Sequence, residues 1–245
     1  MPLKELAERR NLLHRKSDAQ TILRHSLDDL HIGKVALVSS FGAESVVLLH
    51  MTAQIDPGTP VIFLDTEMLF EETLTYQHDV AQFLGLSDVR VITPDRNAVL
   101  QHDVDGLLHQ ADVNACCNLR KVQPLETALA EFDGWITGRK QFQNGSRAQL
   151  PHFEKQGRRI KINPLANWGP DDLRAYMDAY DLPRHPLVAQ GYPSVGCWPC
   201  TTRVAAHENS RAGRWRETSK TECGIHFDPE VGSSRTGQPN PEPLA

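Results

Sequence analysis

The five cysteines of this 245-residue chain fall into three groups, and their spacing suggests two kinds of chemistry. Cys116 and Cys117 are adjacent, Cys197 and Cys200 form the sequence CWPC, and Cys223 stands alone in TECGIH near the C-terminus. Adjacent and C-x-x-C spacings in a chain so poor in cysteine favour one shared site over four unrelated core cysteines. The lone cysteine needs a separate explanation.

Four thiolates can hold a tetrahedral zinc ion or an iron–sulfur cluster. Structural zinc usually takes its ligands from two C-x-x-C turns, and adjacent cysteines would be strained around one ion. The separate iron corners of a cubane can each take one of two neighbouring thiolates, so ligand chemistry favours [4Fe–4S] over zinc. A third interpretation makes CWPC a redox pair, although such a pair normally opens a helix and this one follows the loop GYPSVG.

Cys223 is then a free thiol with charged and polar neighbours. Lys220 and His226 lie close to it in sequence, and a Pro- and Gly-rich end follows. Nearby positive charge lowers a thiol pKa and raises the thiolate fraction, which suits a nucleophile carried on a flexible segment. The alternative is an incidental surface cysteine.

Basic residues lie close to these cysteines in the sequence. Lys121 follows Cys117 by four residues, and Arg211 and Arg214 are three apart in NSRAGRW, so both arginines can share one face of a helical turn. Such side chains are typical of clamps for oxyanions or phosphate. Taken singly, each is more often a solvated surface charge.

The elements that must position these residues alternate between strand and helix. Short apolar runs predict buried strands, and helical spacing predicts the helices between them. The expected strands are 34–40, 60–66, 88–94, 134–138 and 158–165, and the expected helices are 17–30, 43–54, 71–86, 96–109, 119–132 (its start limited by Pro124) and 169–180. This alternation predicts a doubly wound, mostly parallel α/β sheet. From about residue 181 the chain has little periodicity, and we interpret it as a C-terminal extension.

Ligands of such sheets bind beyond the carboxyl ends of the strands. The first strand ends in SSFGAES (39–45), whose small residues let backbone N–H groups approach an anion at a helix N-terminus, although an ordinary strand-to-helix turn explains them equally well. The second strand ends in LDTEMLFEET, where Leu64 and Thr66 are placed to lie beside a bound base.

The composition excludes some classes of partner. The net charge is −5 and 40% of residues are hydrophobic, so a broad nucleic-acid surface is not expected, whereas a core and a local basic pocket are. Residues 1–30 show no signal-peptide pattern and no membrane span is visible, so we expect a soluble, cytoplasmic protein. In that reducing compartment, cysteines serve as ligands or reactive thiols more often than as disulfides.

Four motifs in order, CCNLRKVQPL, GCWPC, RAGRW and TECGIH, resemble the assimilatory adenylyl-sulfate (APS) reductases. These enzymes are the iron–sulfur branch of the phosphoadenylyl-sulfate (PAPS) reductase family. The resemblance covers about residues 34–227. It implies the fold of the N-type ATP pyrophosphatases, with an N-terminal helical segment (1–32), a nucleotide-binding α/β domain with the iron–sulfur site (33–215) and a flexible tail (216–245) that carries the catalytic cysteine.

The resemblance also implies a role for each motif residue. Cys223 matches the catalytic cysteine, and the other four cysteines (Cys116, Cys117, Cys197 and Cys200) match the ligands of a [4Fe–4S] cluster. The implied substrate-binding residues are Lys121, Arg211, Arg214 and His226 at the phosphosulfate, Leu64, Thr66 and Gly138 at the adenosine, Ser39 and Ser40 in the modified phosphate loop, and Arg139 and Arg147 in TGRKQFQNGSRAQL. The loop departs from the common family pattern S-F-S-G-A-E-D.

The implied activity is thioredoxin-dependent reduction of adenylyl sulfate to sulfite and AMP through an S-sulfocysteine, in sulfate assimilation and cysteine biosynthesis. The implied partners are thioredoxin or glutaredoxin and further copies of the chain in a dimer or tetramer, with no nucleic acid and no membrane. The nearest alternative is reduction of PAPS, alone or together with APS. A tRNA-thiolating ATP pyrophosphatase would need an S-G-G-x-D-S loop and a strongly basic surface. A zinc-dependent binding module would be a non-enzymatic alternative.

Overall fold

The structure is a computed structural model, and it describes residues 1–143, 145–216, 218, 220 and 222–226. Of the expected C-terminal tail (216–245), residues 217, 219, 221 and 227–245 lie outside the described residues. No helix within the described ranges combines the length and apolar character that crossing a bilayer requires.

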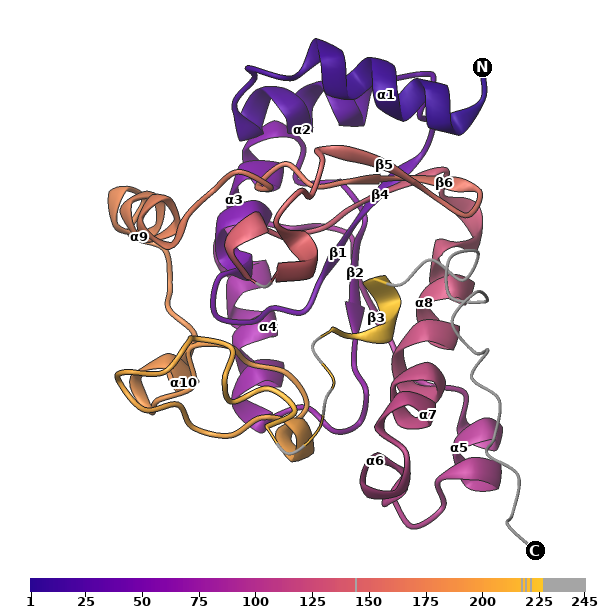
Figure 1. The fold of residues 1–245 in the computed structure, drawn as a ribbon, viewed down its shortest axis with the longest axis vertical. Helices are drawn as coiled ribbons and strands as arrows, with labels where there is room; N and C mark the ends of the chain where they lie inside the picture. Colours follow the sequence, from indigo (N-terminus) through magenta and orange to yellow (C-terminus); the bar gives the residue numbers. More distant parts are fainter. Residues whose placement is uncertain (144, 217, 219, 221, 227–245) are drawn as a thin grey trace, which may run out of the picture.

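A six-stranded sheet with the order β3-β2-β1-β4-β6-β5 forms the centre of the molecule (Figure 1). Its strands are β1 (Val35–Ser39), β2 (Val61–Leu64), β3 (Val89–Ile92), β4 (Gly134–Ile136), β5 (Phe153–Gln156) and β6 (Arg159–Ile162). All neighbours pair in parallel except β5, which pairs antiparallel with β6. The five predicted strands and the doubly wound class are thus confirmed, whereas the edge strand β5 was not predicted.

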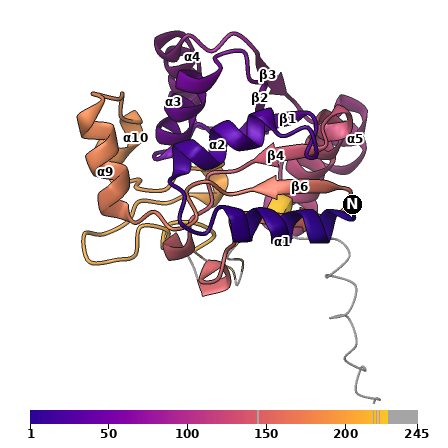
Figure 2. The same cartoon turned by 90° about the horizontal axis from the view of Figure 1, so that it is seen from above.

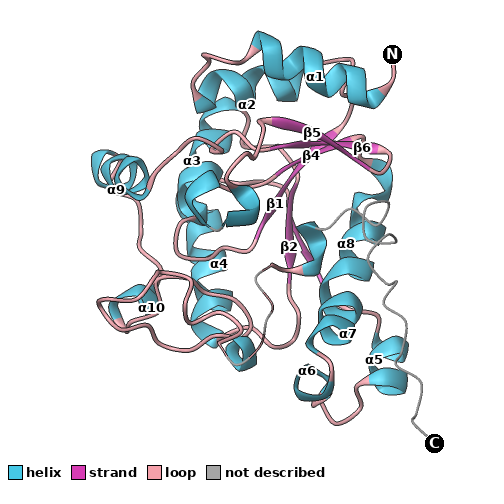
Figure 3. Ribbon diagram, in the orientation of Figure 1, coloured by secondary structure: helices cyan, strands magenta, loops and turns pink. Residues whose placement is uncertain are grey.

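The central strands β1, β2 and β4 are apolar on both faces, as expected of strands that helices cover on both sides (Figure 3). Leu37, Phe63 and Ile136 enter a large core that also takes residues of α1–α4 and α9. Their strand neighbours, such as Ala36 and Trp135, face the opposite way into a smaller core beneath α8. This period of two fixes which residues remain at the strand ends to build a site.

The helices follow the prediction in the first half of the chain. They are α1 (Leu3–Leu13), α2 (Ala19–Asp28), α3 (Ser45–Ile55), α4 (Glu71–Leu84), α5 (Arg96–His102), α6 (Leu108–Ala111), α7 (Val113–Cys117), α8 (Gln123–Ala128), α9 (Pro170–Ala179) and α10 (Pro186–Ala189). Asp18 caps α2 through the amide of Thr21, and the left-handed Gly85 ends α4. Viewed from above, α1 lies along the edge formed by β6 and β5 (Figure 2).

The single helix expected over 96–109 is wrong, because the chain breaks it into α5 and α6. The Asp103 carboxylate accepts a hydrogen bond from the amide of Leu108 at 2.8 Å and pairs with the buried Arg120 at 2.8 Å. Gly106 then reverses the chain in a left-handed conformation (φ 70°). A carboxylate used to anchor a distant arginine therefore stops the helix.

The helix expected over 119–132 begins earlier, at Val113, and contains a π-helical turn. That turn, η1 (Asn118–Val122), joins α7 to α8, and the amide of Gln123 donates to the carbonyl of Asn118. The following Pro124 has no N–H to donate, so it is tolerated at the start of α8 and does not begin the whole helix. Single π turns of this kind are frequent at functional sites.

Residues 181–216 fold back against the sheet edge as loops with α10 and a 3₁₀ turn, η5 (Trp198–Cys200) (Figure 1). An isolated β-bridge between Leu69 and Cys197 joins them to the segment after β2, and a second, between Thr201 and Arg214, lies within the loops themselves. At Gly213 a Cβ would stand 2.1 Å from the carbonyl oxygen of Thr202, so only glycine allows this close approach of backbone.

Candidate active site

A cavity of about 230 Å³ opens at the carboxyl ends of β1 and β4. The chain runs from β1 through β2 to β3 on one side, and β4 lies on the other side of β1. The site is therefore the point where the strand order reverses, which is where open α/β sheets bind their ligands.

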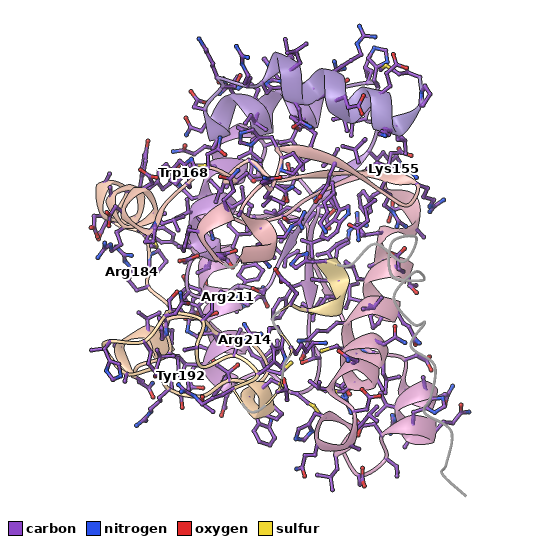
Figure 4. All side chains as sticks on the ribbon, viewed as in Figure 1. Lys155, Trp168, Arg184, Tyr192, Arg211 and Arg214 are labelled. Atoms are coloured by element: carbon purple, nitrogen blue, oxygen red, sulfur yellow. The ribbon has the colours of Figure 1, made fainter. Side chains whose placement is uncertain are left out.

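The structure brings the predicted catalytic and substrate-binding residues together around this cavity. Its lining includes Ser39, Ser40, Leu64, Thr66, Lys121, Gly138, Arg139, Arg147, Arg211, Arg214, Cys223 and His226. They come from the loops after β1, β2 and β4, from the π turn, and from the C-terminal loops. In Figure 4, Arg211 and Arg214 come from the C-terminal loops that lie beside the sheet edge.

Hydrogen bonds from backbone amides to serine hydroxyls fix the shape of the loop after β1. The Ser39 hydroxyl accepts a hydrogen bond from the amide of Phe41, and the Ser45 hydroxyl accepts one from the amide of Gly42. The N-cap of α3 is Glu44, whose side chain does not cap the helix. Glu44 instead pairs with the buried Lys140 at 2.7 Å. The first N–H groups of α3 consequently have no side-chain cap at the cavity.

Positive charge is crowded on one side of the cavity. Burial lowers the pKa of Arg139 to about 9, with repulsion from Arg147 adding to it. Burial and the neighbouring Arg214 likewise lower the pKa of Arg211 to about 10. Within the described residues, the buried Nε of Arg214 has no hydrogen-bond partner. Such a cluster would be relieved by an anion, because the anion would offset the mutual repulsion.

Cys223 lies half-buried among these cations. Its thiol pKa is well below the usual range because of a hydrogen bond from the Cys117 thiol, and because Lys121 and Arg214 lie close. Burial opposes the charge on Lys121, but attraction to the nearby cysteine sulfurs, first of all that of Cys223, outweighs it and raises the pKa of the ammonium. Lys121 and Cys223 therefore favour each other's charged forms, which are those of a clamp and a nucleophile.

His226 is stacked on Trp135, with ring centroids 6.2 Å apart and planes 7° from parallel. Burial, followed by the charges of Lys161 and three arginines, holds the pKa of His226 well below its usual value. The imidazole is thus neutral, and its buried Nδ1 has no partner among the described atoms. A neutral ring beside the cations can orient a bound anion without adding charge.

Three of the remaining four cysteines lie together, and one of them, Cys197, also lines the cavity. Cys116 and Cys117 end α7, while Cys197 and Cys200 flank η5. Cys116 and Cys197 share an apolar cluster with Met68, and Cys200 packs against it. The Thr66 hydroxyl lies 3.1 Å from the Cys197 sulfur. Burial raises the pKa of Cys116 to about 11, with Cys197 adding to it.

Residues 34–203 match the family described as the phosphoadenosine phosphosulfate reductase domain, more than half of the chain. The chain belongs to this family. Among its curated relatives is the adenosine 5'-phosphosulfate reductase of Mesorhizobium japonicum, which is 51% identical over 84% of this chain and 81% of its own. Another of that name, from Mycolicibacterium smegmatis, is 38% identical over 91% of this chain and 94% of its own.

Solved structures agree with this membership of the PAPS reductase family. The PAPS reductase from Candida auris, in a phosphate complex, superposes with a TM-score of 0.71 at 25% identity and covers 82% of this chain and 98% of its own. The yeast FAD synthetase, in complex with FAD, gives a TM-score of 0.53 at 14% identity over 83% of this chain and 77% of its own, which shows a shared fold alone. The fold is thus of the N-type ATP pyrophosphatase kind, as predicted.

Sequence reasoning missed four residues of this reductase-family site. Trp135 is stacked with His226, the Lys161 ammonium lies 4.5 Å from the centroid of the Trp135 ring, and Lys140 and Glu222 line the cavity. Trp135 and Lys161 looked like ordinary strand residues. The position of Glu222 beside Cys223 was the one available signal.

Proposed function

We propose that this chain reduces adenylyl sulfate to sulfite and AMP, using Cys223 as the nucleophile. The observation that carries the proposal is geometric: Cys223 lines the same cavity as Lys121 and Arg214 at the carboxyl edge of the sheet. Relatives that bear the name adenosine 5'-phosphosulfate reductase, at up to 51% identity among those compared, support it.

The nucleotide is proposed to lie across the switch point. Its adenosine contacts Leu64, Thr66 and Gly138, and its phosphosulfate lies near the loop that contains Ser39 and Ser40. The proposed anion contacts are Lys121, Arg211, Arg214 and His226, with further positive charge from Arg139 and Arg147. Cations and neutral donors arranged in this way stabilise charge that moves onto the phosphate.

In the first step, the Cys223 thiolate attacks the sulfonyl sulfur of the substrate. A sulfur–sulfur bond forms, the bond from that sulfur to the bridging oxygen breaks, and AMP leaves with the electron pair. Lys121 and the two C-terminal arginines offset the charge on the phosphosulfate oxygens. The product on the enzyme is S-sulfocysteine.

In the second step, the segment that carries Cys223 leaves the cavity and meets reduced thioredoxin or glutaredoxin. A thiolate of that partner attacks the Cys223 sulfur and expels sulfite, which takes the bonding pair. The mixed disulfide is resolved by the partner's second cysteine, which returns Cys223 as a thiolate. The partner dithiol supplies both electrons.

Four thiols without oxygen or nitrogen ligands fit a [4Fe–4S] cluster by donor chemistry. The described residues contain no group of three or more His, Cys, Asp or Glu side chains that could hold a single metal ion. We propose Cys116, Cys117, Cys197 and Cys200 as the cluster ligands. When bound, the cluster would supply negative charge beside the anion pocket and a cross-link between α7 and the C-terminal loops.

The proposed setting is the cytoplasm, in sulfate assimilation that leads to cysteine. We propose that the protein works as a dimer or tetramer and binds neither nucleic acid nor membrane. These statements extend the family resemblance and the net charge of −5.

The test is mass spectrometry of anaerobically purified protein after adenylyl sulfate is added without reductant. We expect one adduct of about +80 Da on Cys223, which is the mass of SO₃. Cys223→Ser should form no adduct and should keep the visible absorbance of the cluster. An adduct that forms equally in Cys223→Ser contradicts the proposed nucleophile.

Reduction of PAPS is the second candidate, because a Gloeobacter violaceus relative, 39% identical over 79% of this chain, bears the name phosphoadenosine 5'-phosphosulfate reductase. The two substrates differ by a 3'-phosphate. Competition between them at low concentration, with AMP and its 3'-phosphorylated form measured as products, decides which one is used.

A further inference from the structure

Glu222, the residue immediately before Cys223, is buried in an ion pair with Arg147. The guanidinium donates to both carboxylate oxygens, from Nε to Oε1 and from Nη2 to Oε2 at 2.5 Å. Only 6% of the Arg147 side chain and 7% of the Glu222 side chain are exposed. A bidentate pair fixes orientation as well as distance, because both parallel hydrogen bonds must align.

The other terminal nitrogen of Arg147, Nη1, donates a hydrogen bond to the Oε1 of Gln143. Gln143 in turn donates to Glu44, the residue that precedes α3 in the loop after β1. A polar chain thus runs from the loop after β1 to the residue beside the nucleophile. Arg147 lines the cavity, but its hydrogen bonds point to protein groups.

The other end of the same short segment is held by ring and apolar contacts. Residues Gly224–His226 form the 3₁₀ turn η6, Ile225 packs against the smaller core, and His226 stacks on Trp135. Gly224 lies against Val122, because a Cβ at position 224 would be 3.0 Å from its Cγ2. Cys223 therefore lies between an ionic contact on one side and a stacked contact on the other.

We propose that Glu222 and Arg147 form an anchor that positions the Cys223 thiol in the cavity, and that Arg147 serves the reaction through this pair and not by contact with substrate. Both are positioning residues. The role in catalysis rests on the proposed function. The anchor must separate whenever Cys223 leaves the cavity to meet its reductant.

Charge explains why an ion pair suits this position. Arg147 lies among Arg139, Arg211 and Arg214, whose charges repel one another. The Glu222 carboxylate offsets part of that repulsion in the closed arrangement. When an anionic product leaves, the Glu222 carboxylate still offsets charge on these arginines, so the nucleophile returns to the same place.

The first experiment measures the accessibility of Cys223 and uses no nucleotide. The purified full-length, cluster-loaded protein is treated with iodoacetamide above the ordinary thiol pKa of about 8.5, so that every variant is in the thiolate form. Peptide mapping gives the alkylation rate of Cys223. We expect Glu222→Gln and Arg147→Gln each to raise this rate roughly tenfold, and the double variant to raise it no further.

The second experiment measures single-turnover formation of the S-sulfo adduct from adenylyl sulfate. Each single variant should lower the maximal rate roughly tenfold, and the affinity for AMP should change much less. Arg147→Lys separates the two roles of Arg147. Lysine keeps the positive charge but cannot make a bidentate pair, so the anchor predicts that it behaves like Arg147→Gln.

Glu126→Gln is the matched control. Glu126 lies on α8, outside the cavity, and its carboxylate pairs with Arg159 at 2.7 Å, so the variant removes one carboxylate of an ion pair away from the site. Both rates should stay at the wild-type value. The anchor is overturned if alkylation is unchanged in Glu222→Gln, if the two single effects add, or if Arg147→Lys reacts like wild type. Absence of the adduct in wild type would defeat the proposed function, while the alkylation rates would still decide the anchor.

Discussion

Gly196, the residue before the first cysteine of CWPC, makes room for the guanidinium of Arg214, a cation of the candidate site. A Cβ at this position would stand 2.2 Å from Nη2 and 2.4 Å from Cζ of Arg214. The guanidinium there donates to the carbonyl of Val195 at 3.0 Å. The obstructed group is the end of a flexible side chain, so a methyl group would displace it without displacing backbone.

Under the proposed function we therefore expect Gly196→Ala to fold but to lose substrate affinity, with KM for adenylyl sulfate raised roughly tenfold, as for one lost charged hydrogen bond. Steady-state kinetics and the melting temperature check this. Gly169→Ala is the control, because a Cβ there meets its nearest side chain at an ordinary 3.6 Å. Unchanged KM in Gly196→Ala would show that Arg214 does not need this position.

Residue types and spacing were enough to predict one thiol and most of the cations that line the cavity, because these side chains are recognisable in the sequence. The same reasoning could not find Trp135 or Glu222, since their roles arise from contacts with His226 and Arg147, which are 91 and 75 residues away in the chain. Arg147 was predicted as a substrate ligand. The structure adds its carboxylate partner, and only three-dimensional contact could supply that.

At the scale of elements, His185 joins α10 to α4. Its Nδ1 accepts a hydrogen bond from the amide of Leu187 at the start of α10, and its Nε2 therefore donates to the Thr73 hydroxyl at 3.1 Å. Burial lowers the pKa of His185 to about 4, although Glu72 acts in the opposite direction. Protonation would place a hydrogen on Nδ1 and abolish the cap.

The direction of the pH effect follows from the lowered pKa. As the pH falls below about 6.5, His185 becomes protonated in the unfolded chain, whereas in the folded chain it stays neutral down to about pH 4. The stability that the neutral His185 contributes is therefore lost between these two pH values. We expect the unfolding free energy of wild type to exceed that of His185→Gln at pH 7, and the gap to shrink by about 2 kcal/mol towards pH 4. Urea unfolding at several pH values measures it. A gap independent of pH would contradict the neutral, capping histidine.

The sequence predicted well those elements whose burial or ends leave a recognisable pattern of residue types. The strands β1, β2 and β4 carry apolar runs because both faces are covered, and α4 carries an acidic first turn and a terminal glycine. The sequence did not predict the helix end at Asp103 or the edge strand β5, because tertiary contacts or a very short length determine these features. Asp103 ends a helix in order to hold Arg120, and the short edge strand β5 alternates too briefly for a periodic signal.

At the scale of the whole molecule, the candidate site is shared by two parts of the chain. The sheet supplies the loops after β1, β2 and β4, and residues 190–226 supply Arg211, Arg214 and Cys223. The β-bridge between Leu69 and Cys197 and the apolar cluster of Met68, Cys116 and Cys197 join the two parts. The sheet part could be predicted from periodicity, whereas the shape of the C-terminal loops could not, because they follow the surface on which they lie.

This sharing predicts how ligands protect the molecule from hydrogen exchange. AMP at roughly 100 times its dissociation constant should stabilise the protein by about 2.7 kcal/mol and slow exchange in both 39–48 and 206–216. Adenosine lacks the phosphate that the C-terminal arginines would bind, so it should protect the sheet edge and leave 206–216 unchanged. If AMP and adenosine protect the same peptides, the C-terminal loops do not take part in binding the phosphate, and the anion clamp must lie within the sheet part alone.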